Sequence, residues 1–274
     1  MKTYVLGCGP AGLTAAHAAV EAGDDVYILS RKRKSQMFGA QYLHAPIPGI
    51  KCGSPVIVKY TLHGTTDQYR RKVYGEAYDG TVSPEDLPTY HDAWDIRAAY
   101  DDLWDKYENL IQDMPVNRIW MSIFANSGGP KRIINSIPLP ILCQKPADHQ
   151  FSAIRIWAAG EAPEIGRKFP RDPESKKLVI SGMTVEESSV ICNGELDPFW
   201  YRTSLIFGRA TVEWPHDPGF FLPEEDGALV SKPINTTCTC WPHVLRVGRY
   251  GTWRKGVLVH HAYRDVEEWI SSQS

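Results

Sequence analysis

The sequence contains no apolar run that approaches the roughly 20 residues of a membrane-spanning helix, so we expect no membrane segment. It also has no excess of either charge: 30 Lys and Arg stand against 32 Asp and Glu, a formal charge of -2, which argues against nucleic acid as a partner. The six cysteines form no dense framework, a usage typical of a reducing compartment. We therefore expect a cytoplasmic protein that binds a small molecule, in an oligomeric state that the sequence leaves open.

Clustered metal ligands are scarce as well. Cys238 and Cys240 stand close to His243, but together they supply only three candidate ligands, and the sequence has no second cluster. Structural zinc sites use four Cys or His ligands at characteristic spacings. The sequence therefore predicts no metal site.

The strongest pattern present lies in the first thirty positions. Residues 3–6 and 26–29 are short apolar runs typical of strands, and the alanine-rich stretch 13–22 between them is typical of a helix. The turn at residues 7–12 has the G-x-G-x-x-G spacing of a dinucleotide-binding fingerprint, in the strand–turn–helix context that this fingerprint requires. The alternative is a glycine turn in some other α/β protein.

Each residue of this turn has a role in such a site. Gly7 allows the sharp turn, Gly9 lets the backbone approach a pyrophosphate, and Gly12 lets helix and strand pack closely. Pro10 and Ala11 begin the helix, whose N-terminus offers N–H groups and a positive dipole end to phosphate.

The position after the second strand is unusual. Proteins of this type place Asp or Glu there to hold the adenosine ribose, whereas this chain has Ser30, followed by Arg31 and residues 32–34, which are all basic. Such a run would suit the 2′-phosphate of NADP. The alternative, which we favour, is a solvated loop.

The middle of the chain reads as mixed, with more strand than helix. The stretch 37–46 is too apolar for an exposed loop and too broken by Gly and Pro for a regular element, so it could run along a ligand; its His44 is either functional or a hydrogen-bonded structural histidine. A helix is predicted over residues 91–112. Strands are predicted over residues 56–62, 68–74, 118–124, 131–137, 151–158, 178–183, 203–207 and 210–214.

A strand, a glycine turn and a helix return near the C-terminus. Residues 244–247 form the predicted strand, 248–256 the turn and 257–270 the helix. This is a second candidate anion site, to which Arg249 adds a guanidinium that suits phosphate oxygens.

Both ends of the chain resemble one superfamily, the glutathione-reductase-like FAD enzymes, in the branch of UDP-galactopyranose mutase, protoporphyrinogen oxidase and the amine oxidases. The N-terminal match is GCGPAG followed by AGDDVYIL, and the C-terminal match is VLRVGRYGTWRKGVLVHHA. A third, less specific match is the segment 200–205, which is similar to a Tyr-Arg-Ser-Leu segment of the mutase. Together these motifs cover roughly a quarter of the chain.

The resemblance implies an α/β fold: a Rossmann-like FAD/NAD(P)-binding domain with an interleaved, smaller mixed α+β substrate domain. The first would comprise residues 1–55 and 235–274 with parts of 115–145, and the second residues 56–234. FAD is the implied cofactor, with NADPH or NADH as candidate reductants. The implied cofactor-binding residues are Gly7, Gly9, Pro10, Ala11, Gly12, Ser30, Arg31, Gly39, Ala40, Gln41, Gly248, Arg249, Gly256, Val257 and Leu258.

The resemblance also implies catalysis on a small molecule. The candidate catalytic residues are Tyr201, Arg202, His44 and Lys255. Three cations near a flavin, Arg202, Arg249 and Lys255, would suit an anionic substrate. Lys255 stands where the mutase has a substrate-facing tyrosine, and the chain is shorter than most members, so the substrate domain must be reduced. We expect an FAD-dependent oxidoreductase for an anionic or amine-bearing substrate. The alternatives are a mutase-like isomerase of sugar nucleotides and a dinucleotide-binding module without turnover.

Overall fold

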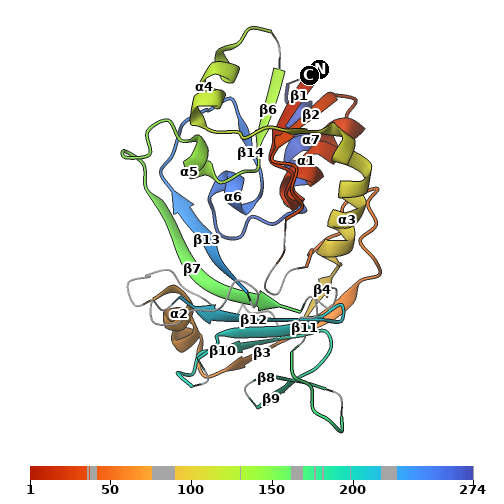
Figure 1. The fold of residues 1–274 in the computed structure, drawn as a ribbon, viewed down its shortest axis with the longest axis vertical. Helices are drawn as coiled ribbons and strands as arrows, with labels where there is room; N and C mark the ends of the chain where they lie inside the picture. The colour runs from red at the N-terminus through yellow and green to blue at the C-terminus, as the bar shows by residue number, and fades with distance from the viewer. Residues whose placement is uncertain are drawn as a thin grey trace.

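The computed structural model describes residues 1–35, 37, 42–75, 90–129, 131–161, 169–175, 177–180, 182–197, 199–216 and 227–273. These residues form a five-stranded parallel sheet with helices on both faces, a seven-stranded mixed sheet and a separate two-stranded hairpin (Figure 1). None of the helices in these ranges combines the length and the apolar character that crossing a membrane requires.

The parallel sheet has the order β14-β6-β1-β2-β5, and every neighbouring pair in it is parallel. Since β1 lies between β2 and β6, the chain crosses over twice from the centre, which is typical of a dinucleotide-binding sheet. The strands are β1 (Lys2–Leu6), β2 (Asp25–Ser30), β5 (Ile111–Asp113), β6 (Lys131–Asn135) and β14 (Leu245–Arg246).

Successive residues of these strands serve two separate cores, as the alternation of a strand requires. Val5 packs with one set of helices, α1 (Pro10–Glu21), α3 (Ile96–Tyr107) and α7 (His261–Ser271). Leu6 packs on the opposite face, with residues of α4 (Arg118–Asn126) and α5 (Leu139–Leu142). The strand–helix–strand pattern predicted for the N-terminus is confirmed. The helix predicted over 91–112 is shorter: it begins after Asp95, whose carboxylate caps it, and a 3-10 turn, η2 (Glu108–Leu110), follows.

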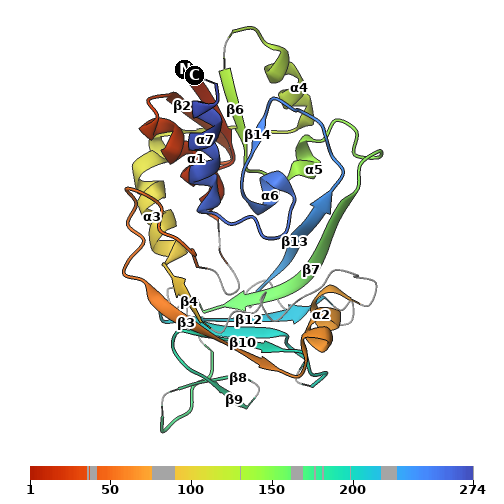
Figure 2. The same ribbon diagram turned by 180° about the vertical axis from the view of Figure 1, so that it is seen from behind.

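The mixed sheet has the order β13-β7-β12-β11-β10-β3-β4 (Figure 2). Only β10 and β3 pair in parallel; the remaining pairs of this sheet are antiparallel. Its strands are β3 (Val56–His63), β4 (Tyr90–Ala93), β7 (Phe151–Gly160), β10 (Ser189–Asn193), β11 (Arg202–Ile206), β12 (Arg209–Pro215) and β13 (Ala228–Thr236). The hairpin of β8 (Leu178–Ile180) and β9 (Met183–Val185) covers one face of the sheet.

Two predicted strands are helices. Residues 68–74 belong to α2 (Thr66–Tyr74), which begins with a reciprocal capping box between Thr65 and Gln68. The stretch 118–124 belongs to α4, whose N-cap Asn117 accepts hydrogen bonds from two backbone N–H groups. The isoleucines Ile119 and Ile123 favour a strand in the sequence pattern. In α4 they are four residues apart, so both lie on the outer face of the helix, where their side chains are exposed.

Candidate cofactor and substrate site

The first glycine turn joins β1 to α1 in a backbone that only glycine fits at two positions. Gly7 has a φ of +105°, and a Cβ there would lie 2.5 Å from Oγ of Ser136. At Gly12, a Cβ would lie 2.1 Å from the carbonyl oxygen of Gly7, so the helix packs directly against the turn. These two glycines therefore serve the packing of the turn itself.

Gly9 differs, because no contact with the residues that the structure describes requires it to be glycine. It is the N-cap residue of α1 with an ordinary extended backbone, φ −71° and ψ 174°, and no side chain caps the helix there. A Cβ on Gly9 would meet Oγ of Ser35 at 3.6 Å, an ordinary contact. The next residues, Pro10 and Ala11, form the first turn of α1, where a helix offers no backbone acceptor to its N–H groups. This turn therefore keeps an open, electropositive surface that suits a phosphate.

A tyrosine from α3 holds the glycine turn against the basic loop. The hydroxyl of Tyr100 donates to the carbonyl oxygen of Cys8 at 2.8 Å and accepts from the backbone N–H of Ser35 at 3.0 Å. The thiol of Cys8 reaches the carbonyl oxygen of Arg31 at 3.4 Å. Tyr100 lies within the helix predicted over residues 91–112, and no local pattern in the sequence indicated its polar role.

Ser30 ends β2, and residues 31–35 are exposed. The register pairs Ser30 with Asp113 on β5, and the Asp113 carboxylate accepts a long hydrogen bond of 3.4 Å from the backbone N–H of Lys32. Lys34 forms an ion pair of 2.5 Å with Asp101. The structure thus places a carboxylate beside Ser30, on the neighbouring strand rather than on the same one.

The second glycine turn lies directly on the first. Gly248 has a φ of +66°, and a Cβ there would lie 2.5 Å from Cβ of Ala11, in the first turn of α1. Gly251 is equally close to β6: a Cβ would lie 2.2 Å from the carbonyl oxygen of Asn135. The chain forms a short helix here, α6 (Gly248–Thr252), and the helix predicted over 257–270 begins only at His261. Two stretches separated by most of the sequence therefore meet at one helix N-terminus.

Arg249 is mostly buried and faces β13. Its Nε and one terminal nitrogen donate to the carbonyl oxygen of Pro233, at 3.1 and 2.9 Å. Burial lowers the pKa of Arg249, and the nearby charge of Arg202 lowers it further. In this structure Arg249 therefore fastens the second glycine turn to the mixed sheet.

The segment before α7 carries three more predicted cofactor residues and a group of histidines. Gly256, Val257 and Leu258 lie in the connection that leads to His260, the N-cap of α7. The ring of His260 lies 4.5 Å from that of His261 and stacks with that of His44 at 6.1 Å. Burial, and then the neighbouring histidines and Arg264, lower the pKa of His260 to about 4, so it is neutral at physiological pH. Nδ1 of His260 is buried without a hydrogen-bond partner among the described residues.

Arg202 belongs to a buried ion network on the mixed sheet. One of its terminal nitrogens lies 2.6 Å from the carboxylate of Glu213, which also accepts from Nζ of Lys232 at 2.8 Å and from the Tyr201 hydroxyl at 2.5 Å. Glu213 is only 2% exposed, against 23% for Arg202. Burial alone would raise the pKa of Glu213, but the charges of Arg202 and Lys232 hold it at about 2. The carboxylate thus lies between the Arg202 guanidinium and the Lys232 amine, and burial lowers the pKa of Lys232 to about 7 although Glu213 raises it.

This network lies on the face of the sheet opposite the β8–β9 hairpin. Arg202 is directly paired with Cys192 and with Glu213, so these side chains point to one face. Cys192 packs in the same core as Tyr42, whose hydroxyl bonds that of Tyr60 at 2.8 Å. Tyr42 follows Gly39, Ala40 and Gln41, the predicted flavin-side residues, which lie outside the described residues.

Lys255 lies beside β13, where its backbone N–H donates to the carbonyl oxygen of Ile234 at 2.9 Å. Its Nζ lies 4.9 Å from the ring centroid of Tyr74, on α2. The third cation beside Arg202 and Arg249 is Lys232, which sequence reasoning missed together with Glu213. A buried charge in an otherwise apolar strand, such as Glu213 in β12, is the signal that could have found this network.

Comparisons with known proteins bear on the fold. The sequence matches no family model and no curated protein. Among solved structures, a reduced UDP-galactopyranose mutase matches at 11% identity with a TM-score of 0.58, covering 100% of this chain and 96% of that one. A flavoprotein/dehydrogenase from Cytophaga hutchinsonii matches at 11% identity and a TM-score of 0.53 over 98% of this chain and 75% of that one. BrvH, a flavin-dependent halogenase from Brevundimonas sp. BAL3, matches at 8% identity and a TM-score of 0.53, over 99% and 71%. The predicted fold class is therefore confirmed: this chain has the Rossmann-type α/β fold of the FAD-binding flavoproteins.

Proposed function

We propose that this protein is an FAD-dependent oxidoreductase for a small anionic substrate. The observation that carries the proposal is the contact of Gly248 with Ala11, which joins both glycine motifs at the N-terminus of α1. Among the described residues, the backbone at Gly9, the first turn of α1 and the second glycine turn come together there. The flavoprotein fold of the chain supports the same assignment.

The residues present fit FAD. Gly9, Ala11 and Gly12 would hold the pyrophosphate, Ser30 would bond the adenosine ribose, and the connection 256–258 with the N-terminus of α7 would approach the flavin ring. When bound, FAD supplies hydride and electron transfer, and the protein supplies orientation and electrostatics.

The buried ion network supports an anionic substrate. Arg202 and Lys232 share the single carboxylate of Glu213, and Arg249 adds a further positive charge nearby. Arginine can grip a carboxylate or phosphate with two parallel hydrogen bonds, which fixes the orientation of the substrate as well as its charge. We place the substrate between this network and Tyr42.

A mutase-like isomerase for sugar nucleotides remains the second candidate, because a UDP-galactopyranose mutase shares the fold over the full length of this chain. An oxidoreductase and a non-catalytic module differ in what a donor does to the flavin. The test mixes FAD-loaded protein anaerobically with NADPH, NADH, amines and 2-hydroxy acids, and follows the flavin absorbance. We expect at least one donor class to reduce bound FAD faster than free FAD. Bound FAD that no donor reduces would contradict an oxidoreductase.

Replacing Arg202 by lysine is expected to weaken the binding of anionic donors. Arg202→Lys keeps the charge beside Glu213 but loses the guanidinium fork, so we expect the half-saturating donor concentration to rise about tenfold, with FAD content unchanged. The matched control is Lys177→Gln, which removes an exposed lysine that pairs with Glu186 and should leave both quantities unchanged. An Arg202→Lys enzyme with unaltered donor dependence would show that Arg202 is only a partner of Glu213.

We expect NADPH and NADH to bind alike. Residues 31–33 are exposed and Lys34 is paired with Asp101, as in a solvated loop, so no fixed cradle for a 2′-phosphate is formed. Titration of both nucleotides at one salt concentration tests this, because exposed charges are screened over roughly 8–10 Å. A clear preference for NADPH that disappears in Arg33→Ala would assign the loop to the 2′-phosphate.

A further inference from the structure

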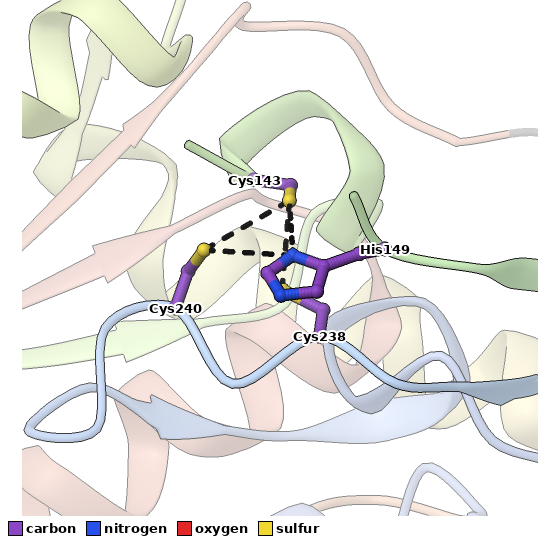
Figure 3. Close-up of side chains that lie close together, drawn as sticks. All are labelled: Cys143, His149, Cys238 and Cys240. Carbon is purple, nitrogen blue, oxygen red and sulfur yellow. Dashed lines mark hydrogen bonds between the residues drawn. The ribbon is translucent and has the colours of Figure 1, made fainter. Parts of the chain in front are cut away.

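Four potential metal ligands meet at the end of the long β7–β13 ribbon that points toward the parallel sheet (Figure 3). Cys143 follows α5 directly, and His149 precedes β7. Cys238 and Cys240 follow β13. The Sγ and Nδ1 atoms of these residues all lie within 4.8 Å of one another, and their side chains converge from two separate stretches of the chain.

The distances are those of a tetrahedral thiolate site. Ligands at about 2.3 Å for sulfur and about 2.0 Å for nitrogen place neighbouring ligand atoms about 3.5–3.8 Å apart. Sγ of Cys143 lies 3.7 Å from that of Cys238 and 3.9 Å from that of Cys240. Nδ1 of His149 lies 3.1 Å from Sγ of Cys143 and 3.8 Å from Sγ of Cys240. These four pairs lie within about half an ångström of the tetrahedral spacing, and the other pairs lie within 4.8 Å.

The side chains and their surroundings suit a closed site. The three cysteines are buried and free, and the imidazole directs Nδ1 rather than Nε2 at them (Figure 3). Neighbouring groups also fix the loops that carry the ligands: Arg246 donates to the carbonyl oxygens of both Cys238 and Cys240. Such outer contacts are typical of metal sites, because they orient the ligands.

We propose that Cys143, His149, Cys238 and Cys240 bind one Zn²⁺ as a structural site. Three thiolates and an imidazole form a Cys₃His set, which zinc favours in closed four-coordinate sites. Spacing in the sequence groups only Cys238, Cys240 and His243. Cys143 and His149 reach the site through the fold. His243 is not part of the cluster.

The ion would tie both strands of the ribbon to the parallel-sheet side of the molecule. β7 and β13 pair from end to end, and Cys238 and Cys240 lie between β13 and the second glycine turn. Trp241, beside Cys240, donates from its indole nitrogen to the carbonyl oxygen of Leu142 at 2.8 Å, so the same corner is also packed. Zinc there would stabilise the corner from which the second glycine turn begins, independently of the proposed FAD chemistry.

The test is the metal content of the untagged protein, purified under reducing conditions and measured by mass spectrometry. We expect one zinc per chain in the wild type, and at least a tenfold lower content in His149→Ala and Cys240→Ser. His243→Ala and Cys52→Ser are the matched controls and should keep their zinc, because both residues lie outside the cluster. Zinc retained by His149→Ala and Cys240→Ser, or another metal that zinc cannot displace, would overturn the assignment.

Cobalt substitution covers the case in which a ligand variant fails to fold. Wild-type protein stripped of metal and titrated with Co²⁺ should develop the intense visible bands of tetrahedral cobalt and the charge-transfer bands of thiolate ligands, with an end point at one equivalent. Zinc added afterwards should abolish them. Wild-type protein that contains no metal and gives no such spectrum would overturn the proposal.

Discussion

Gly9→Val is expected to abolish FAD binding while the protein remains folded. The backbone at Gly9 is already in the extended region that valine favours, and a Cβ there makes only an ordinary contact of 3.6 Å with Ser35. The branched side chain would fill the space through which a pyrophosphate approaches the turn. We expect FAD affinity to fall about a hundredfold or more, equivalent to about 2.8 kcal/mol, in a fluorescence titration.

The matched variant is Gly12→Ala, which we expect to lower the stability of the fold. Its Cβ would lie 2.1 Å from the carbonyl oxygen of Gly7, so the helix must move away from the turn. Gly→Ala in a helix otherwise stabilises by roughly 1 kcal/mol, and here we expect a loss of stability instead. Thermal unfolding of both variants separates the two roles. A Gly9→Val protein that binds FAD normally would show that the pyrophosphate does not lie at this turn.

Glu213→Gln is expected to be strongly destabilising. It leaves the partly buried guanidinium of Arg202 without the carboxylate that pairs with it. Removing one partner of a buried ion pair typically costs about 3–5 kcal/mol, and we expect a loss of that order in urea unfolding. The matched control is Glu186→Gln: Glu186 is 73% exposed and pairs only loosely with Lys177, so its loss should change stability by less than about 1 kcal/mol. Equal effects of the two substitutions would contradict a buried network.

The same carboxylate predicts a pH dependence of stability. The pKa of Glu213 is held at about 2 in the folded protein, below its ordinary value of 4.5. The unfolded chain therefore takes up the proton first on acidification, and the free energy of unfolding falls as the pH drops from about 4.5 to about 2. Glu213→Gln should lose this part of the acid dependence. An unchanged acid profile in the variant would show that other carboxylates dominate.

Local patterns predicted the parts of the fold whose causes are local. The glycine fingerprint and its flanking periodicity predicted β1, α1 and β2 to within three residues at each end, because turn, helix and strands follow each other directly. The predictions of strands over residues 68–74 and 118–124 were wrong. In both stretches the side-chain pattern favours a strand, but the N-cap residues Thr65 and Asn117 start the helices α2 and α4. β10 and β13 were not predicted.

The sites depend on contacts that no spacing encodes. Glu213 on β12 meets Lys232 because β12 and β13 are the two neighbours of β7, and it meets Arg202 because β11 pairs with β12. His149 meets Cys240 because β7 and β13 pair and their ends lie together. The resemblance placed Arg202 in a substrate site but could not supply its partners. The sequence therefore predicted the two glycine turns but neither the ion network around Glu213 nor the cluster of Cys143 and His149 with Cys238 and Cys240.

The most direct test of the account is the flavin content of the wild-type protein. Purified protein is saturated with FAD, freed of unbound cofactor by gel filtration, and examined by absorbance, with the released molecule identified by its mass. The two glycine turns that meet at Ala11 and Gly248 predict one FAD per chain. A well-folded preparation that shows no flavin absorbance after saturation would contradict the account.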